Sequence, residues 1–216
     1  MADLHALWTD PSVPVVLRST KTSPFGRKVR IAAQVLGVDG RITRLDADTR
    51  NANDDLRQQN PLGKMPCLLI GEEAFYDSGV ILELLDLVVG SGQLLPPVSQ
   101  PIGRLRTLTR ARLADGITEA SLLMVYEDRF REREQRSRIW LDHQRGKVER
   151  ALAVFEADPP DPETTDLVSI GLACALGYLD WRKPVDWRSH HPRLVAWLRS
   201  FSAAVPAYDQ TESTAA

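Results

Sequence analysis

The pattern of apolar and polar positions divides the chain into a mixed first part and a helical second part. Short apolar runs predict strands at residues 13–18, 41–45, 67–70 and 74–76. Apolar residues three and four positions apart predict helices from Ser23 to Gly37 and from Asp77 to Gly90, with a weaker polar helix or turn at residues 53–59. The resulting order, β-α-β-α-β-β-α, is typical of a small mixed sheet with helices.

Strand-like runs stop after residue 90, and long helical patterns follow. Residues 91–100 are the predicted linker, so we expect a first domain at residues 13–92 and an all-helical domain at residues 99–208. Helices of the second domain are predicted at residues 101–130, 137–155 and 166–178. The last of these is almost wholly apolar or small, which predicts the buried centre of that domain.

Composition and charge limit the possible partners. The 27 Lys and Arg against 29 Asp and Glu give a formal net charge of −2, so we expect no large basic surface for nucleic acid or anionic lipid. No run approaches the roughly 18 apolar residues of a membrane span, and the start lacks a signal-peptide pattern. Cys67 and Cys174 lie far apart without metal-ligand spacing and are expected to be buried. We therefore expect a soluble cytoplasmic protein without a metal.

Two predicted helices begin with side chains that can hold an anion. Ser23 precedes Pro24, which is the pattern of an N-cap followed by a proline in the first helical position. Asp77 and Ser78 open a later helix, where the unpaired N–H groups and the hydroxyl suit a carboxylate and the Asp77 side chain suits an ammonium. Both patterns also fit ordinary helix caps without any ligand.

Four motifs in a fixed order resemble the glutathione S-transferase family: SPFGRKVR at residues 23–30, NPLGKMP at 60–66, DSGVI at 77–81 and ACALGYLDW at 173–181. The resemblance covers residues 13–208 and is closest to bacterial members with a serine near the first helix. It implies an α/β thioredoxin-like N-terminal domain, an all-α C-terminal domain and a cytoplasmic homodimer. Reduced glutathione would be the cosubstrate, with a small electrophile as second substrate.

The resemblance also implies roles for individual residues. Ser23 takes the catalytic position, where a hydroxyl at a helix N-terminus can stabilise a thiolate; Ser19, Thr20 and Thr22 on the same loop are alternatives. The implied glutathione-binding residues are Lys64, Met65, Pro66, Asp77 and Ser78, and the implied electrophile pocket contains Phe25, Met124 and Tyr126. A stripe such as Met124, Tyr126 and Phe130 is more often a plain helical core.

The resemblance gives the two prolines of residues 60–67 separate roles. We expect a cis Met65–Pro66 peptide that turns the polar backbone groups of Met65 toward the cysteinyl unit of glutathione. Lys64 either meets the glycyl carboxylate or lies in solvent. Arg27 and Lys28 either accompany a bound anion or point to water, and we expect water.

The family pattern has one departure, because Asp166 precedes Ser169 where the usual order places the hydroxyl first. The cap is expected to work in the swapped order.

The leading hypothesis is conjugation of glutathione to an electrophile. The alternatives are glutathione-dependent reduction or isomerisation on the same fold, and a module that binds glutathione or another protein without catalysis.

Overall fold

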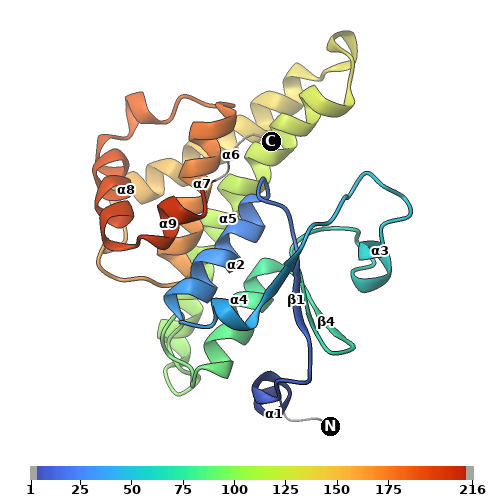
Figure 1. The fold of residues 1–216 in the computed structure, drawn as a ribbon. Helices are drawn as coiled ribbons and strands as arrows, with labels where there is room; N and C mark the ends of the chain where they lie inside the picture. The colour runs from blue at the N-terminus through green and yellow to red at the C-terminus, as the bar shows by residue number, and fades with distance from the viewer. Residues whose placement is uncertain (1–3, 213–216) are drawn as a thin grey trace. The chain divides into compact units, whose positions relative to one another are not determined.

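The computed structural model describes residues 4–212, which divide into two compact units (Figure 1). The first unit contains the N-terminal residues as far as Arg104 together with the residues from Ala207 onward. The second unit is Leu105–Pro206. Two distant parts of the sequence therefore build the first unit, whereas we expected residues 207 and 208 in the helical domain.

The first unit is built on a four-stranded sheet in the order β2-β1-β3-β4. Its strands are β1 (Val15–Arg18), β2 (Thr43–Leu45), β3 (Cys67–Ile70) and β4 (Glu73–Phe75). Strand β1 pairs in parallel with β2 and antiparallel with β3, and β4 returns antiparallel to β3. This arrangement is the mixed sheet that the apolar runs predict.

The helices of the first unit are α1 (Leu4–Thr9), α2 (Pro24–Val35), α3 (Leu56–Gln59) and α4 (Ser78–Val88), with a 3-10 turn η1 at Asp39–Arg41. Helices α2 and α4 contact each other, and α4 also contacts β3. The core between these elements includes Leu17 and Leu68 from the sheet and Val29, Ile31 and Ile81 from the helices, all at most 1% exposed. Helix α1 has no counterpart in the sequence prediction, because its six residues bury only Trp8 and carry little periodic signal.

Arg27, on α2, binds the residues from Tyr208 to Thr211. Its Nη2 donates a 2.7 Å hydrogen bond to the carbonyl oxygen of Tyr208, and its guanidinium lies 4.1 Å from the centroid of the Tyr208 ring. Arg27 Nε also donates to Thr211 Oγ1 at 3.4 Å. These contacts and the packing of α2 against α9 (Ala207–Gln210) explain why the C-terminal residues belong to the first unit.

Helices make up the second unit. They are α5 (Pro101–Phe130), which begins in the first unit, α6 (Arg138–Ala157), α7 (Leu167–Arg182) and α8 (Pro192–Ala204), with 3-10 turns η2 (Arg133–Gln135) and η3 (Arg188–His190). Helix α7 is buried on nearly every face, which confirms its prediction as a central helix. Asp166 Oδ1 accepts hydrogen bonds from the backbone N–H groups of Val168 and Ser169, and Ser169 Oγ accepts one from Asp166 N. The swapped capping box is therefore confirmed.

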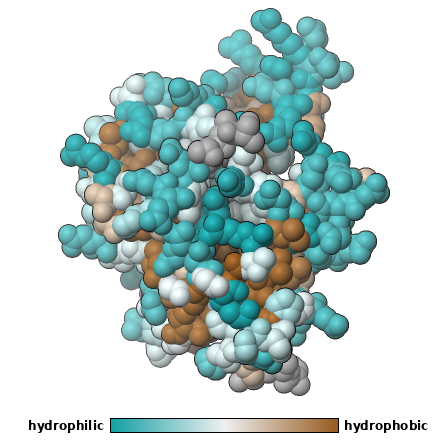
Figure 2. Space-filling model, in the orientation of Figure 1, coloured by the Kyte–Doolittle hydropathy of each residue, from teal (hydrophilic) through white to brown (hydrophobic). Residues whose placement is uncertain are grey.

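The surface seen in Figure 2 is mostly hydrophilic, and hydrophobic residues appear on it in separate patches. Within residues 4–212, no helix combines the length and the apolar character needed to cross a membrane.

Candidate functional site

Ser23 caps helix α2. Its backbone is extended, and Ser23 Oγ accepts a 3.0 Å hydrogen bond from the backbone N–H of Gly26. The residue is only 8% exposed. A hydroxyl has one proton and two lone pairs, so accepting from Gly26 N leaves the proton of Ser23 for another acceptor. Among the residues described, no acceptor for that proton is found. The cap and a thiolate contact are therefore compatible in one side chain.

The neighbouring hydroxyls are engaged elsewhere. Ser19 Oγ donates a long 3.4 Å hydrogen bond to Thr20 O, and the hydroxyls of Thr20 and Thr22 lie 3.1 Å apart. Thr20 Oγ1 also lies 3.4 Å from Met65 Sδ, which joins the β1–α2 loop to the residue before Pro66. A Cβ at Gly26 would lie 1.8 Å from Ser19 Oγ, so any other residue at this position would require the Ser19 side chain to move.

The loop at residues 60–66 is held by the buried side chain of Asn60, which is 2% exposed. Asn60 Nδ2 donates to the Lys64 carbonyl oxygen at 2.8 Å, and Asn60 Oδ1 accepts from Leu62 N at 3.0 Å. Gly63 has φ +59°, a conformation that disfavours residues with a Cβ. The Met65–Pro66 peptide is cis, as is the Tyr76–Asp77 peptide. Pro66 is buried, Met65 is half-buried and Lys64 is exposed.

Asp77 and Ser78 open helix α4. Asp77 is the N-cap, and its Oδ1 accepts a 2.9 Å hydrogen bond from Gly79 N. The Asp77 side chain is exposed, whereas Ser78 is 2% exposed. Helix α4 therefore begins with an accessible carboxylate beside a buried hydroxyl, a combination that can hold the ammonium and carboxylate of an amino acid.

The expectation that Arg27 and Lys28 point to water is wrong, because each is only 3% exposed. Arg27 turns to the C-terminal residues. Lys28 turns to the start of α4, where its Nζ donates a 3.3 Å hydrogen bond to Ser78 Oγ. Residues 26–30 of α2 are all buried, and α2 packs against both α4 and α9, so these two charged residues do not face solvent.

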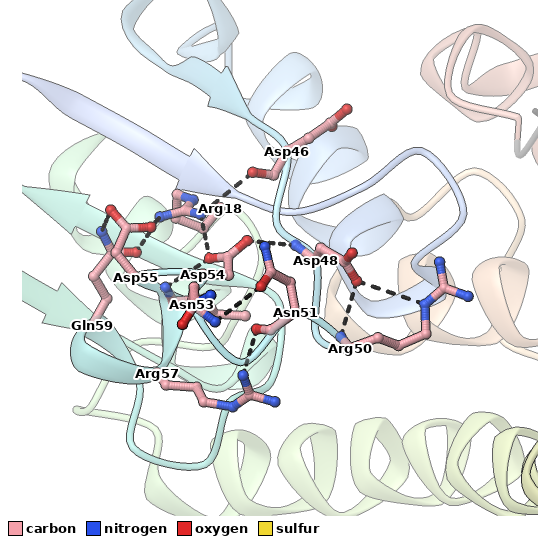
Figure 3. Close-up of polar contacts among 11 residues, drawn as sticks. Arg18, Asp46, Asp48, Arg50, Asn51, Asn53, Asp54, Asp55, Arg57 and Gln59 are labelled. Atoms are coloured by element: carbon pink, nitrogen blue, oxygen red, sulfur yellow. Dashed lines mark hydrogen bonds and ion pairs between the residues drawn. The ribbon is translucent and has the colours of Figure 1, made fainter.

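Arg18, at the end of β1, organises the segment between β2 and the loop at residues 60–66 (Figure 3). It is 3% exposed and forms ion pairs with Asp54 at 2.8 Å and with Asp55 at 2.5 Å. Its Nη1 also donates to Gln59 Oε1 at 2.6 Å. Arg18 thus fixes the residues that lead into Asn60, so the loop that follows starts from a defined position.

Asp54 joins several parts of this segment. Its carboxylate accepts hydrogen bonds from the backbone N–H groups of Asp48 at 2.7 Å and Leu56 at 2.8 Å. These two bonds, followed by the charge of Arg18, hold the pKa of Asp54 below its ordinary value. The ionised form is therefore the one that the fold stabilises.

Cys67 and Cys174 are buried, as the sequence predicts. Burial raises the pKa of the Cys67 thiol, although the charge of Arg18 opposes the shift. A buried thiol with a raised pKa is a poor nucleophile, so Cys67 acts as a small apolar residue beside Ala47 and Leu56. Within residues 4–212, no group of three or more His, Cys, Asp or Glu side chains could hold a metal ion.

The residues expected around the electrophile lie on different elements. Phe25 is half-buried on α2, with Lys28 Nζ 6.0 Å from its ring centroid. On α5, Met124 is 5% exposed, and the Tyr126 ring makes an edge contact with Phe130 at 5.2 Å between centroids. Met124 and Tyr126 are described within the second unit, so the composition of an electrophile pocket stays a prediction.

Comparison with known proteins places these observations in a family. Residues 22–88 match the model for the glutathione S-transferase N-terminal domain. The chain is 36% identical over 180 residues to the uncharacterized GST-like protein YibF of Escherichia coli, covering 81% of this chain and 87% of that protein. The chain belongs to the glutathione S-transferase family. The thioredoxin-like sheet with a mostly helical remainder is the fold of this family, as the sequence predicts.

Solved glutathione S-transferase structures support the same assignment. A glutathione transferase family member from Pseudomonas fluorescens Pf-5, with bound glutathione, superposes with a TM-score of 0.82 at 38% identity, covering 93% of this chain and all of that chain. A structure of a family member from the same organism holds S-(propanoic acid)-glutathione and superposes with a TM-score of 0.81 at 39% identity, with the same coverage.

Sequence reasoning missed three residues that build the site. Arg18 ends a strand and gave no signal, because its partners lie more than 30 positions away in sequence. Asn60 was read only as part of a turn, although asparagine before proline commonly bonds nearby backbone. The burial of Lys28 could have been suspected from its position, since α2 is apolar at Val29, Ile31 and Ala32 immediately after it.

Proposed function

We propose that this protein is a glutathione transferase that conjugates reduced glutathione to small electrophiles, with Ser23 stabilising the thiolate. The observation that carries the proposal is the hydrogen bond from Gly26 N to Ser23 Oγ, which leaves the hydroxyl proton as a donor at the N-terminus of α2. The partial positive charge of the helix end favours an anion at the same point. Two related structures contain glutathione or an S-substituted glutathione, which supports this ligand class.

In this proposal the glutathione molecule extends along the first unit. Asp77 takes the γ-glutamyl ammonium, and Ser78 with the free N–H groups of α4 takes its carboxylate. The backbone of Met65, before cis Pro66, pairs with the cysteinyl unit, and Lys64 meets the glycyl carboxylate. Phe25, on α2 of the same unit, lies beside the electrophile.

The chemical step needs only a thiolate and a leaving group. The thiol gives its proton to solvent, and the hydrogen bond from Ser23 keeps the sulfur anionic at neutral pH, each pKa unit of lowering requiring about 1.4 kcal/mol. The sulfur lone pair forms the new S–C bond while the leaving group departs with the electrons of the bond that breaks. A route through a mixed disulfide would need a sulfur at position 23, and Cys67 is buried with a raised pKa.

The test compares Ser23→Ala with Ser19→Ala, a serine on the same loop. We expect wild-type protein to bind immobilised glutathione and to turn over a generic aryl halide. Ser23→Ala should lower kcat/KM about 100-fold and return the pKa of bound glutathione toward about 8.5, read from thiolate absorbance. A loss in Ser19→Ala with unchanged Ser23→Ala would reassign the hydroxyl. Binding without turnover of any electrophile would favour a non-catalytic glutathione module.

We further propose a cytoplasmic homodimer. Val80 and Leu87 are 47% and 50% exposed and lie seven residues apart, so they share one face of α4. Val98 and Ile102, which follow in the same unit, are 77% and 61% exposed. An apolar surface of this kind suits an isologous contact with a second copy. Sedimentation should give a dimer at micromolar protein, and Leu87→Glu should give a monomer.

A further inference from the structure

The buried lysine on α2 bears on how a ligand would be held at α4. Lys28 is 3% exposed and Ser78 is 2% exposed, and Lys28 Nζ lies 3.3 Å from Ser78 Oγ. Both residues belong to the first unit, and their helices contact each other directly. The contact therefore joins the helix capped by Ser23 to the first residue of the helix capped by Asp77.

The direction of this hydrogen bond is fixed by chemistry. An ammonium can only donate, so Ser78 Oγ must be the acceptor, and the Ser78 proton must point to a different group. In the part of the chain that the structure describes, Ser78 Oγ has no acceptor for that proton. Ser78 is thus arranged in the same way as Ser23, since each hydroxyl accepts from a protein donor and keeps its own proton for another partner.

Burying a lysine has a cost in side-chain entropy and hydration. We propose that Lys28 is a positioning residue for the γ-glutamyl α-carboxylate of glutathione. It orients the Ser78 hydroxyl toward the carboxylate and adds a positive charge behind it. This inference rests on the proposed glutathione site and assigns to Lys28 a role in recognising one carboxylate of the ligand.

The test crosses a protein variant with a ligand variant. The ligands are glutathione and γ-aminobutyryl-cysteinyl-glycine, which lacks only the glutamyl α-carboxylate, and calorimetry gives Kd for each. Lys28→Met should weaken glutathione binding about 10-fold to 100-fold, the range for a lost charged hydrogen bond. The same change should alter binding of the analogue by less than about 3-fold. A purely structural role would weaken both ligands equally, and that result would overturn the inference.

Ser78→Ala supplies a second readout. Because Lys28 is proposed to act partly through Ser78, the effect of Lys28→Met on glutathione should shrink at least about 3-fold in the Ser78→Ala background. Lys28→Gln keeps a donor but no charge, so it should show the same ligand dependence with a smaller loss, and it serves if Lys28→Met does not fold. Equal additive losses in both backgrounds would overturn the inference.

The control is Lys147→Met, which removes an exposed lysine from α6 in the second unit. It should leave both Kd values within about 2-fold of wild type, since surface substitutions have small effects. If the wild-type protein does not bind glutathione, the proposed function is wrong. If the wild-type protein binds glutathione but Lys28→Met weakens glutathione and the analogue equally, only the role given to Lys28 is wrong.

Discussion

The side-chain amide of Asn60 holds the backbone of Lys64 through a 2.8 Å hydrogen bond from Nδ2 to the carbonyl oxygen. The same side chain accepts from Leu62 N, so one buried group secures the turn at two points. The turn ends at Met65 and Pro66, whose backbone position would set the place of the cysteinyl unit.

Replacing Asn60 by alanine removes the hydrogen bonds to the carbonyl oxygen of Lys64 and from the backbone N–H of Leu62. We expect Asn60→Ala to lower the free energy of unfolding by about 1–3 kcal/mol. Because the loop would then be less ordered, we also expect weaker binding of glutathione. Urea denaturation gives the first quantity and calorimetry the second.

Asn51→Ala is the matched control, because Asn51 is exposed and its Oδ1 only accepts from Asn53 N. It should change stability by no more than about 0.5 kcal/mol. Equal effects of the two substitutions would show that the loop does not depend on Asn60.

Asp54 predicts an acid-dependent loss of stability. Its pKa in the folded protein is lowered, chiefly by the N–H groups of Asp48 and Leu56. A lowered pKa stabilises the fold above the unfolded pKa, about 3.9, and that contribution is lost as the pH falls through the folded-state value. The stability difference between wild type and Asp54→Asn should therefore be larger near pH 7 than near pH 3.

The control for this measurement is Asp142→Asn. Asp142 is 57% exposed, and its ion pairs with Arg138 and Arg145 are both 3.8 Å long. Its substitution should have little effect at either pH. A difference for Asp54→Asn that stays constant with pH would contradict the role given to its charge.

We expect the contribution of Tyr178 to the stability of the fold to change at high pH. Burial raises the pKa of Tyr178 to about 12, with Tyr126 adding to the shift and Arg182 opposing it. Because the folded protein keeps the proton longer than the unfolded chain, this stabilising contribution is complete below about pH 10 and lost as the pH rises through about 12. In a rapid pH jump, Tyr178→Phe should lack phenolate absorbance that wild type gains near pH 12. If wild type gains this extra phenolate absorbance near pH 10 instead, the prediction is wrong.

The capping box of α7 predicts a measurable stability cost. Asp166→Ala removes the acceptor for Val168 N and Ser169 N, and should lower the free energy of unfolding by about 0.5–2 kcal/mol. Asp166→Ser keeps an acceptor at the cap and should restore most of the loss. Equal losses in the two variants would mean that the cap contributes little.

The sequence was sufficient for features that depend on local spacing. The order of strands and helices in the first unit, the caps at Ser23 and Asp77 and the reversed box at Asp166 all follow from residues within a few positions of one another. Helix α7 could be predicted as central, because almost every position is apolar or small.

Features that depend on distant partners could not be predicted. Arg18 meets Asp54 and Asp55 only after β1 and the segment following β2 come together. The burial of Arg27 depends on Tyr208, which lies 181 positions further along the chain. Local patterns carry no information on such pairs, so they predict that a charged residue near the start of a helix lies in solvent.

The hydrogen bonds of Arg27 with Tyr208 and Thr211 affect the order in which the first unit can fold during synthesis. Most of the first unit is translated before the second unit, yet its native contacts include Tyr208 and Thr211, which are translated after the second unit. Helix α2, with the cap that would meet the thiolate, therefore cannot reach its final packing until residues 207–211 have been translated. A nascent chain arrested before Ala207 should carry the sheet but lack this contact, so completion of the first unit follows synthesis of the second.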